Sequence, residues 1–286
     1  MPQTRRPRTS GSVRSRRNGS DLLARIAIAV PAAVIAIAFV DIGGTAWMVL
    51  MILLGCACLS ELYRLLSRWR PVSLIGFAAL TGMCLAARFG GHQQVLEVEA
   101  CTIPVLFLAL VARGEGSGGA TLAIAGTLLG VFWIGTAFAH AVLLGEVRHG
   151  KGIIIDTMVG TFLADTGAYI GGRLFGRRPL APAISPHKTV EGLAIGMIVA
   201  IVAVYFAGIY QSGWLTHGTA FVLGATVAVL GPIGDLFESL VKRDAGTKDT
   251  GSLFGPHGGA LDRLDAVMFT MVAAYYIWIA APHPAG

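Results

Sequence analysis

Residues 231–265 read GPIGDLFESLVKRDAGTKDTGSLFGPHGGALDRLD, the densest cluster of charge in a chain that is only 13% charged. The stretch begins and ends in apolar runs, and its glycines favour a shaped loop between two helices. Carboxylates alternate with cations along it, which is typical of a site for a metal-bound polyphosphate. Its titratable residues are Asp235, Glu238, Lys242, Arg243, Asp244, Lys248, Asp249, His257, Asp262, Arg263 and Asp265.

The chain as a whole is too apolar for a soluble protein. It has 286 residues, is 55% hydrophobic and has a mean hydropathy of +0.70. Apolar runs of roughly 18 or more residues recur along its length, as a bilayer requires. We therefore predict an all-α polytopic integral membrane protein with about nine transmembrane helices. The expected spans are 22–40, 45–66, 71–89, 98–112, 120–144, 153–172, 190–210, 217–241 and 262–281.

The chain divides into three parts. Residues 1–21 are predicted to be a disordered, arginine-rich tail, because they combine arginine with Ser, Gly and Pro. Residues 22–149 carry the first five spans, and residues 150–286 carry catalytic spans six to nine with the motif-bearing loops. A cleaved signal peptide is the alternative for the start of the chain.

The positive charges predict the orientation. With the N-terminus in the cytoplasm, all but three of the 22 lysines and arginines lie in the tail or in cytoplasmic loops. The exceptions are Arg88, Arg148 and Lys151. Because cytoplasmic loops are enriched in Lys and Arg, we expect the C-terminus outside a cell inner (plasma) membrane.

Ionisable residues inside the predicted spans are candidates for a site, since they are costly in a bilayer. Asp165 and Tyr169 share one face of span six. Asp235, Glu238 and Lys242 share one face of span eight, at i, i+3 and i+7. A structural ion-pair network is the simpler interpretation of these three. The orientation brings both spans' carboxylates to the cytoplasmic end.

Other carboxylates have competing interpretations. Asp262 and Asp265 open the ninth span, where an acidic residue also complements a helix N-terminus. Glu61 ends the second span close to Arg64, either as a surface pair or in contact with the site. Asp156 lies near the outer end of span six, where we expect a role in starting the helix.

The cytoplasmic loop after span six reads GGRLFGRRPLAPAISPHKTVEG, residues 171–192. Ordinary positive-inside charge explains some of its cations. The order of the string SPHKTVEG is too particular for that explanation, and it favours phosphate binding. The candidate phosphate-binding residues are Arg173, Arg177, Arg178, Ser185, His187, Lys188 and Thr189.

Carboxylates from separate helices, with oxygen as their only ligand atoms, are typical of Mg²⁺ and not of zinc. The chain has no G-x-x-x-x-G-K-[ST] pattern, so a P-loop is excluded. No Ser–His–Asp arrangement is evident, which disfavours covalent hydrolysis. These residues therefore indicate phosphoryl or nucleotidyl transfer at the cytoplasmic face.

Residues 239–265 resemble the signature of the phosphatidate cytidylyltransferases (CDP-diacylglycerol synthases). That signature runs S-x-x-K-R-x4-K-D and then H-G-G-x-x-D-R-x-D, and every fixed position is met here. Residues 164–169, ADTGAY, are similar to the family's A-D-x-x-A-Y segment. Residues 185–192 are similar to its S-P-K-K-T-x-E-G segment, with His187 where lysine is usual.

The resemblance implies that CTP and phosphatidate react to give CDP-diacylglycerol and pyrophosphate in phospholipid biosynthesis. It implies a bilayer-embedded enzyme, a homodimer, that uses Mg²⁺, and it leaves a second metal ion open. Asp235, Asp262, Asp249 and Asp265 are the expected metal ligands, with Asp235 and Asp262 sharing the ion. The cations expected to bind the triphosphate or the lipid phosphate are Lys242, Arg243, Lys248 and Arg263. Residues expected to contact the substrates are Asp165, Tyr169, Ser185, Lys188, Thr189, His257, Gly258 and Gly259.

Three other functions remain open at this point. A CTP-dependent polyprenol kinase would move the γ-phosphoryl group, although the complete H-G-G-x-x-D-R-x-D ending disfavours it. An alcohol phosphatidyltransferase would need a D-G-x-x-A-R pattern that we do not find. A transporter would be expected to place its charges near the midplane between repeats, whereas these charges gather at one face.

Overall fold

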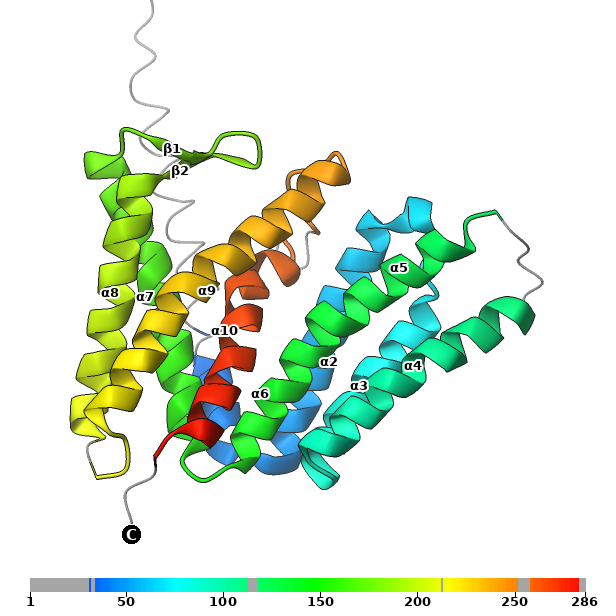
Figure 1. Ribbon diagram of the computed structural model, residues 1–286, viewed down its shortest axis with the longest axis horizontal. Helices are drawn as coiled ribbons and strands as arrows, with labels where there is room; N and C mark the ends of the chain where they lie inside the picture. Colours follow the sequence, from blue (N-terminus) through cyan, green and yellow to red (C-terminus); the bar gives the residue numbers. More distant parts are fainter. Residues whose placement is uncertain (1–30, 32–33, 113–117, 212, 252–257, 283–286) are drawn as a thin grey trace, which may run out of the picture.

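The computed structural model describes residues 31, 34–112, 118–211, 213–251 and 258–282, and these are folded almost entirely into helices (Figure 1). The first group comprises α2 (Gly44–Leu65), the short 3-10 helix η1 (Ser67–Trp69), α3 (Ser73–Phe89), α4 (His92–Ala112), α5 (Ala120–Gly130), η2 (Val131–Gly135) and α6 (Thr136–Glu146). The second comprises α7 (Gly150–Phe175), α8 (Val190–Tyr210), α9 (His217–Asp244) and α10 (Leu261–Ala280). Residues 34–42 are also helical.

The predicted helical membrane architecture is confirmed, but the count of nine is not. Among the described residues, seven helices are long and apolar enough to cross a membrane, and α3 is apolar but only 17 residues long. The predicted arginine-rich tail, 1–21, and most of the predicted first span, 22–40, lie outside the described residues. The predicted fourth span, 98–112, starts too late, because α4 begins at His92. The first turn of α4 is polar, so a search for apolar runs does not include it.

Helix α10 joins the two groups. It packs against α9 and α7 on one side and against α6 and α2 on the other (Figure 1). Helices α7 and α8 lie against each other along their length. Their approach requires glycine: a Cβ on Gly196 would lie 2.7 Å from the Ala164 carbonyl oxygen, and one on Gly192 would lie 2.7 Å from that of Ala168. Small residues at such contacts are typical of helix packing in membranes.

Helices α5 and α6 form one rod with a π-helical turn, η2, between them. Turns of this kind re-aim side chains within a continuous helix. Here Trp133 meets Phe237 of α9 edge-on, with ring centroids 4.7 Å apart. The contact ties the first group to the helix that carries Asp235.

The loop after α7 contains a small hairpin, which the all-α prediction did not include. Strand β1 (Pro179–Ala181) pairs antiparallel with β2 (Ser185–Thr189). Strands of three and five residues, each containing a proline, give almost no pattern in the sequence. The hairpin places Lys188 and Thr189 directly before α8, at the same end of the bundle as the end of α9 (Figure 1).

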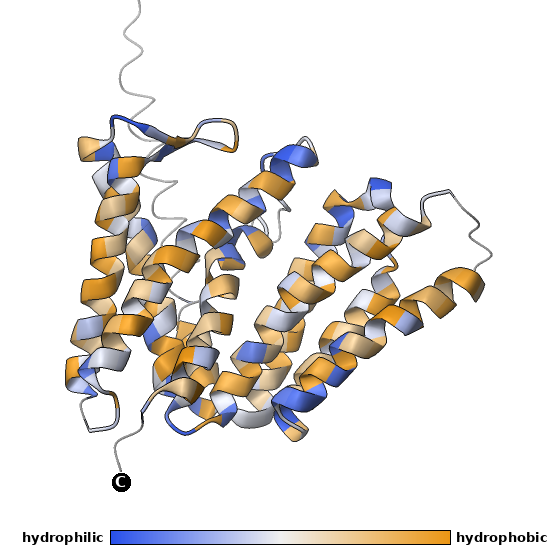
Figure 2. Cartoon of the chain, viewed as in Figure 1, coloured by the Kyte–Doolittle hydropathy of each residue, from blue (hydrophilic) through white to orange (hydrophobic). Residues whose placement is uncertain are grey.

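Polar residues gather at the two ends of the bundle, and the middle is apolar (Figure 2). The hairpin, the end of α9 and the end of α2 all lie at one end, as the alternation of spans predicts (Figure 1). The last turn of α3, which carries Arg88, and the loop after α6, which carries Arg148, lie at the other end. Which end faces the cytoplasm stays a prediction from the positive charges.

Candidate active site

A cavity of about 1310 Å³ lies between the two helix groups and contains both polar and apolar walls. Helices α7, α9 and α10 and strand β2 supply its polar end, and α2 and α6 extend its apolar wall. Nine of the residues expected at the site line it: Asp165, Tyr169, Lys188, Thr189, Asp235, Lys242, Asp262, Arg263 and Asp265. The topology thus brings four separate segments to one cavity.

Three carboxylates converge at the polar end. Asp235 and Glu238 of α9 and Asp265 of α10 each have an oxygen within 4.8 Å of the others. Spacing of i, i+3 puts the first two on one helix face. The sequence kept Glu238 as a site candidate on the same helix face but did not include it among the expected metal ligands, although this spacing places it beside Asp235.

The acidic cluster suits a divalent metal. Its donors are all oxygen, the ligand type that Mg²⁺ prefers. The Glu238 side chain is only 1% exposed, and its Oε1 is buried without a hydrogen-bond partner among the described residues. Such an orphaned carboxylate oxygen is costly in an apolar interior unless a cation or proton meets it.

Two lysines neutralise part of this charge. Lys188, from β2, forms an ion pair with Asp235. Lys242, one turn after Glu238 on α9, pairs with Glu238 and also lies 2.8 Å from Asp262 Oδ1. Lys242 therefore links the acidic cluster to the first turn of α10.

Asp262 is held by several donors. Its Oδ2 accepts from the backbone N–H of Thr250 at 3.0 Å, the Thr250 hydroxyl at 2.9 Å and the backbone N–H of Gly259 at 2.7 Å. Its Oδ1 faces Lys242. For Asp262 to share a metal with Asp235, as expected from the sequence, Lys242 would have to release that oxygen.

Of the other predicted residues, Arg173 and His187 also line the cavity, and the described residues that follow do not. Arg243 donates from Nε to the Ile184 carbonyl at 3.1 Å, which fastens the end of α9 to the hairpin turn. Lys248 and Asp249 are exposed in the loop that follows α9, and Ser185 opens β2. Gly258, at a φ of 81°, and Gly259 precede Asp262. His257 lies outside the described residues.

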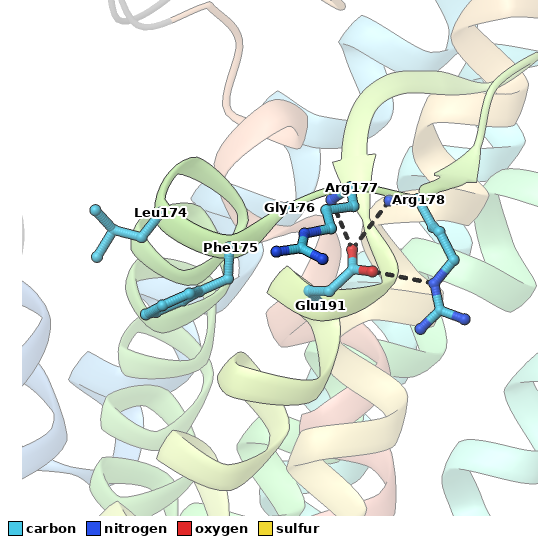
Figure 3. Close-up of a pocket in the computed structure, with 6 residues that line it drawn as sticks. All are labelled: Leu174, Phe175, Gly176, Arg177, Arg178 and Glu191. Carbon is cyan, nitrogen blue, oxygen red and sulfur yellow. Dashed lines mark hydrogen bonds and ion pairs between the residues drawn. The ribbon is translucent and has the colours of Figure 1, made fainter.

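A second, smaller pocket of about 470 Å³ lies beside the hairpin and is lined by Leu174, Phe175, Gly176, Arg177, Arg178 and Glu191 (Figure 3). Glu191 accepts from the backbone N–H groups of Arg177 and Arg178, at 3.0 and 3.1 Å, and from Arg178 Nε at 3.0 Å (Figure 3). Glu191, the glutamate of SPHKTVEG, thus fixes the segment between α7 and β1 to the first turn of α8.

Asp156 lies at the opposite end of the bundle from the acidic cluster. It is 3% exposed in the second turn of α7, and it accepts from Gln211 Nε2 at 3.1 Å. Asp156 therefore connects the start of α7 to the end of α8.

Comparison with known proteins gives one consistent match. The chain matches the Cytidylyltransferase family over residues 23–280. A phosphatidate cytidylyltransferase of Bacillus subtilis (strain 168) is 29% identical over 273 residues, covering 90% of this chain and 97% of that protein. One from Staphylococcus haemolyticus (strain JCSC1435) is 31% identical over 257 residues, covering 86% and 95%. One from Mycobacterium bovis (strain ATCC BAA-935 / AF2122/97) is 32% identical over 202 residues, covering 68% and 64%.

Proposed function

Because this chain belongs to the cytidylyltransferase family, we propose that it is a phosphatidate cytidylyltransferase, which joins CMP from CTP to phosphatidate. The names of its relatives support the reaction. The observation that carries the proposal is the cavity, in which an acidic and basic end is continuous with an apolar wall. A nucleoside triphosphate needs the charged end, and the acyl chains of a lipid need the apolar wall.

The reaction exchanges one phosphoanhydride bond for another. A phosphate oxygen of phosphatidate attacks the α-phosphorus of CTP, and the bond from that phosphorus to the bridging oxygen of the β-phosphate breaks. Pyrophosphate leaves with the bonding electrons, and CDP-diacylglycerol remains. The attacking phosphate is already anionic at neutral pH, so positioning and charge neutralisation supply the catalysis.

The cavity's cations support this division of work. Lys188, Lys242 and Arg263 line it from three different elements, so they would hold phosphate groups from several sides. Asp165 lines the cavity from α7, where it would contact the metal or the nucleotide. In this proposal the two lysines exchange carboxylate partners for phosphate oxygens when the substrates bind.

We propose that the metal is Mg²⁺, held by Asp235 with Glu238 and Asp265 of the acidic cluster, and that Asp262 joins them if Lys242 moves to a phosphate. When bound, the ion would neutralise charge on the triphosphate and polarise the α-phosphate. The asymmetry of Lys and Arg supports a cytoplasmic site in the plasma membrane. CTP would then enter from the side where it is made.

The apolar wall is proposed to seat an acyl chain of phosphatidate. It includes Leu54, Met158 and Met271, and it reaches Trp47 near the start of α2. Trp47 lies fourteen residues before Glu61 on α2, which is about 20 Å along a helix. The Trp47 indole is held by a 2.9 Å hydrogen bond to the Ala141 carbonyl, so the end of this wall is fixed.

Trp47→Ala is expected to shift the preference of the enzyme toward longer acyl chains. Removing the indole lengthens the cavity, and each additional buried methylene contributes about 0.8 kcal/mol. The ratio of kcat/KM for 18-carbon over 14-carbon phosphatidate should rise about 5-fold or more, within the range that apolar pockets achieve. Leu53→Ala, on the lipid-facing side of the same helix where Leu53 is 63% exposed, should leave the ratio unchanged. An unchanged ratio in Trp47→Ala would refute the acyl seat.

The reaction itself is tested by its stoichiometry. Purified protein in detergent, given CTP, phosphatidate and Mg²⁺, is expected to form one CDP-diacylglycerol and one pyrophosphate for each CTP consumed. Mass spectrometry of the lipid and an enzyme-coupled pyrophosphate assay measure both. Accumulation of CDP with a phosphorylated lipid would contradict the proposal.

A further inference from the structure

Glu61 lies outside the cavity but next to the loop that carries the site's signature residues. It is in the last turn of α2 and is 1% exposed. Its Oε1 accepts from the Ala260 backbone N–H at 3.1 Å, and its Oε2 accepts from that of Leu261 at 2.9 Å. The Thr250 hydroxyl lies 3.1 Å from Oε2. A carboxylate buried in this way is stabilised by the N-terminus of α10, whose first N–H groups have no helical partner.

Glu61 and Asp262 together hold both ends of one loop. Asp262 accepts from the backbone N–H groups of Thr250 and Gly259, whereas Glu61 accepts from those of Ala260 and Leu261, and the Thr250 hydroxyl lies between the two carboxylates. The loop between α9 and α10 therefore has both of its described ends, Thr250 and residues 259–261, fixed to the same pair of carboxylates. The approach is close enough to require glycine, because a Cβ on Gly251 would lie 2.6 Å from Glu61 Oε1 and one on Gly259 would collide with Glu61 Oε2.

We infer that Glu61 is a positioning residue for CTP: it fixes the first turn of α10, and so aims Asp262 and Arg263 at the triphosphate. This rests on the proposed function. It also explains why the first helix group belongs to the site, since α2 supplies one of the two carboxylates that hold the described ends of the loop between α9 and α10. The residue acts through the loop and not by touching substrate.

Glu61→Gln is expected to weaken CTP use selectively. A glutamine offers one acceptor oxygen, and its NH₂ group would face a backbone N–H, so one of the two backbone hydrogen bonds is lost. The KM for CTP should rise about 10-fold or more and kcat/KM for CTP should fall about 30-fold, with the KM for phosphatidate within about 2-fold of wild type. Partial unfolding would lower kcat by removing active molecules and would leave both KM values unchanged.

Hydrogen exchange provides a second readout that does not depend on the reaction. The amides of Ala260 and Leu261 should exchange about 10-fold faster or more in Glu61→Gln than in wild type, whereas those in the middle of α10 should not change. Glu97→Gln, the same chemical change at an exposed position of α4, serves as the control and should match wild type in both experiments.

The outcomes separate this inference from the proposed function. A wild-type protein that makes no CDP-diacylglycerol overturns the proposed function, and the exchange experiment still tests the anchor. An active wild type whose Glu61→Gln variant keeps its KM for CTP overturns the positioning role, even if exchange is faster. A raised KM without faster exchange at Ala260 and Leu261 also overturns it, because Glu61 would then act by another route.

Discussion

Asp235→Asn is expected to lower kcat for CDP-diacylglycerol formation about 10³-fold or more, the range seen when a key electrostatic group is lost from an active site. The substitution keeps the size of the side chain but removes its charge from the acidic cluster. Glu238 and Asp265 would remain, with one ligand fewer for a metal, and Lys188 would lose its carboxylate partner. Steady-state assays across a Mg²⁺ titration measure the effect.

The matched control for this variant is Asp244→Asn. Asp244 is the last residue of α9 and is exposed, so it undergoes the same chemical change on the same helix outside the cavity. Its activity should stay within about 2-fold of wild type, as for most surface substitutions. Near-normal Mg²⁺-dependent activity in both Asp235→Asn and Asp262→Asn would refute the metal site proposed here.

Lys242→Met is expected to destabilise the protein as well as inactivate it. Lys242 is the shared partner of Glu238, which is 1% exposed, and of Asp262, which is 9% exposed at its side chain. Removing one partner of a buried ion pair costs about 3–5 kcal/mol, because the other charge stays buried. The apparent Tm in detergent should fall by about 6 °C or more.

A second substitution separates the two effects of Lys242→Met. Adding Glu238→Gln removes one of the uncompensated charges, so the double variant should recover at least half of the lost Tm. Its activity should stay at the level of the single variant, since the cation for the phosphates is still missing. Lys151→Met, which removes an exposed lysine at the other end of the bundle, should change Tm by less than about 2 °C. Recovery of activity without recovery of Tm would contradict the role given to Lys242.

The sequence was sufficient to predict most of the described helices and to bring the candidate site residues to one end of the bundle. Apolar runs give α7, α8, α9 and α10 to within three residues at every end, because bilayer-spanning length is a strong constraint. Alternation of the spans then delivers Asp165, the hairpin and the loop after α9 to one end. That inference needs only the number of membrane crossings between these segments, because each crossing moves the chain to the opposite end of the bundle.

The pairing of side chains within the site could not be predicted. Helical spacing puts Asp235 and Glu238 on one face, but it does not say which carboxylate meets a lysine and which meets an unfilled space. In the structure Lys242 reaches back to Glu238 and across to Asp262, and the carboxylate left with an unpartnered oxygen is Glu238. These contacts depend on the relative depth of α9 and α10, which apolar periodicity does not fix.

The contact of Glu61 with the loop was equally hidden, because 189 residues separate Glu61 from Thr250. The sequence left Glu61 open between a surface pair with Arg64 and contact with the site. Only the packing of α10 against α2 brings the glutamate to the N–H groups of Ala260 and Leu261. Long-range polar contacts of this kind leave no local pattern.

We propose above all that this cavity transfers the CMP unit of CTP to phosphatidate. The most direct measurement uses CTP labelled with ³²P at the α-phosphate, incubated with purified protein and phosphatidate in mixed micelles. We predict that the label enters the lipid fraction as CDP-diacylglycerol in wild type and that this transfer is lost in Asp235→Asn. Label that remains in CDP while the γ-phosphoryl group moves to lipid would contradict the claim.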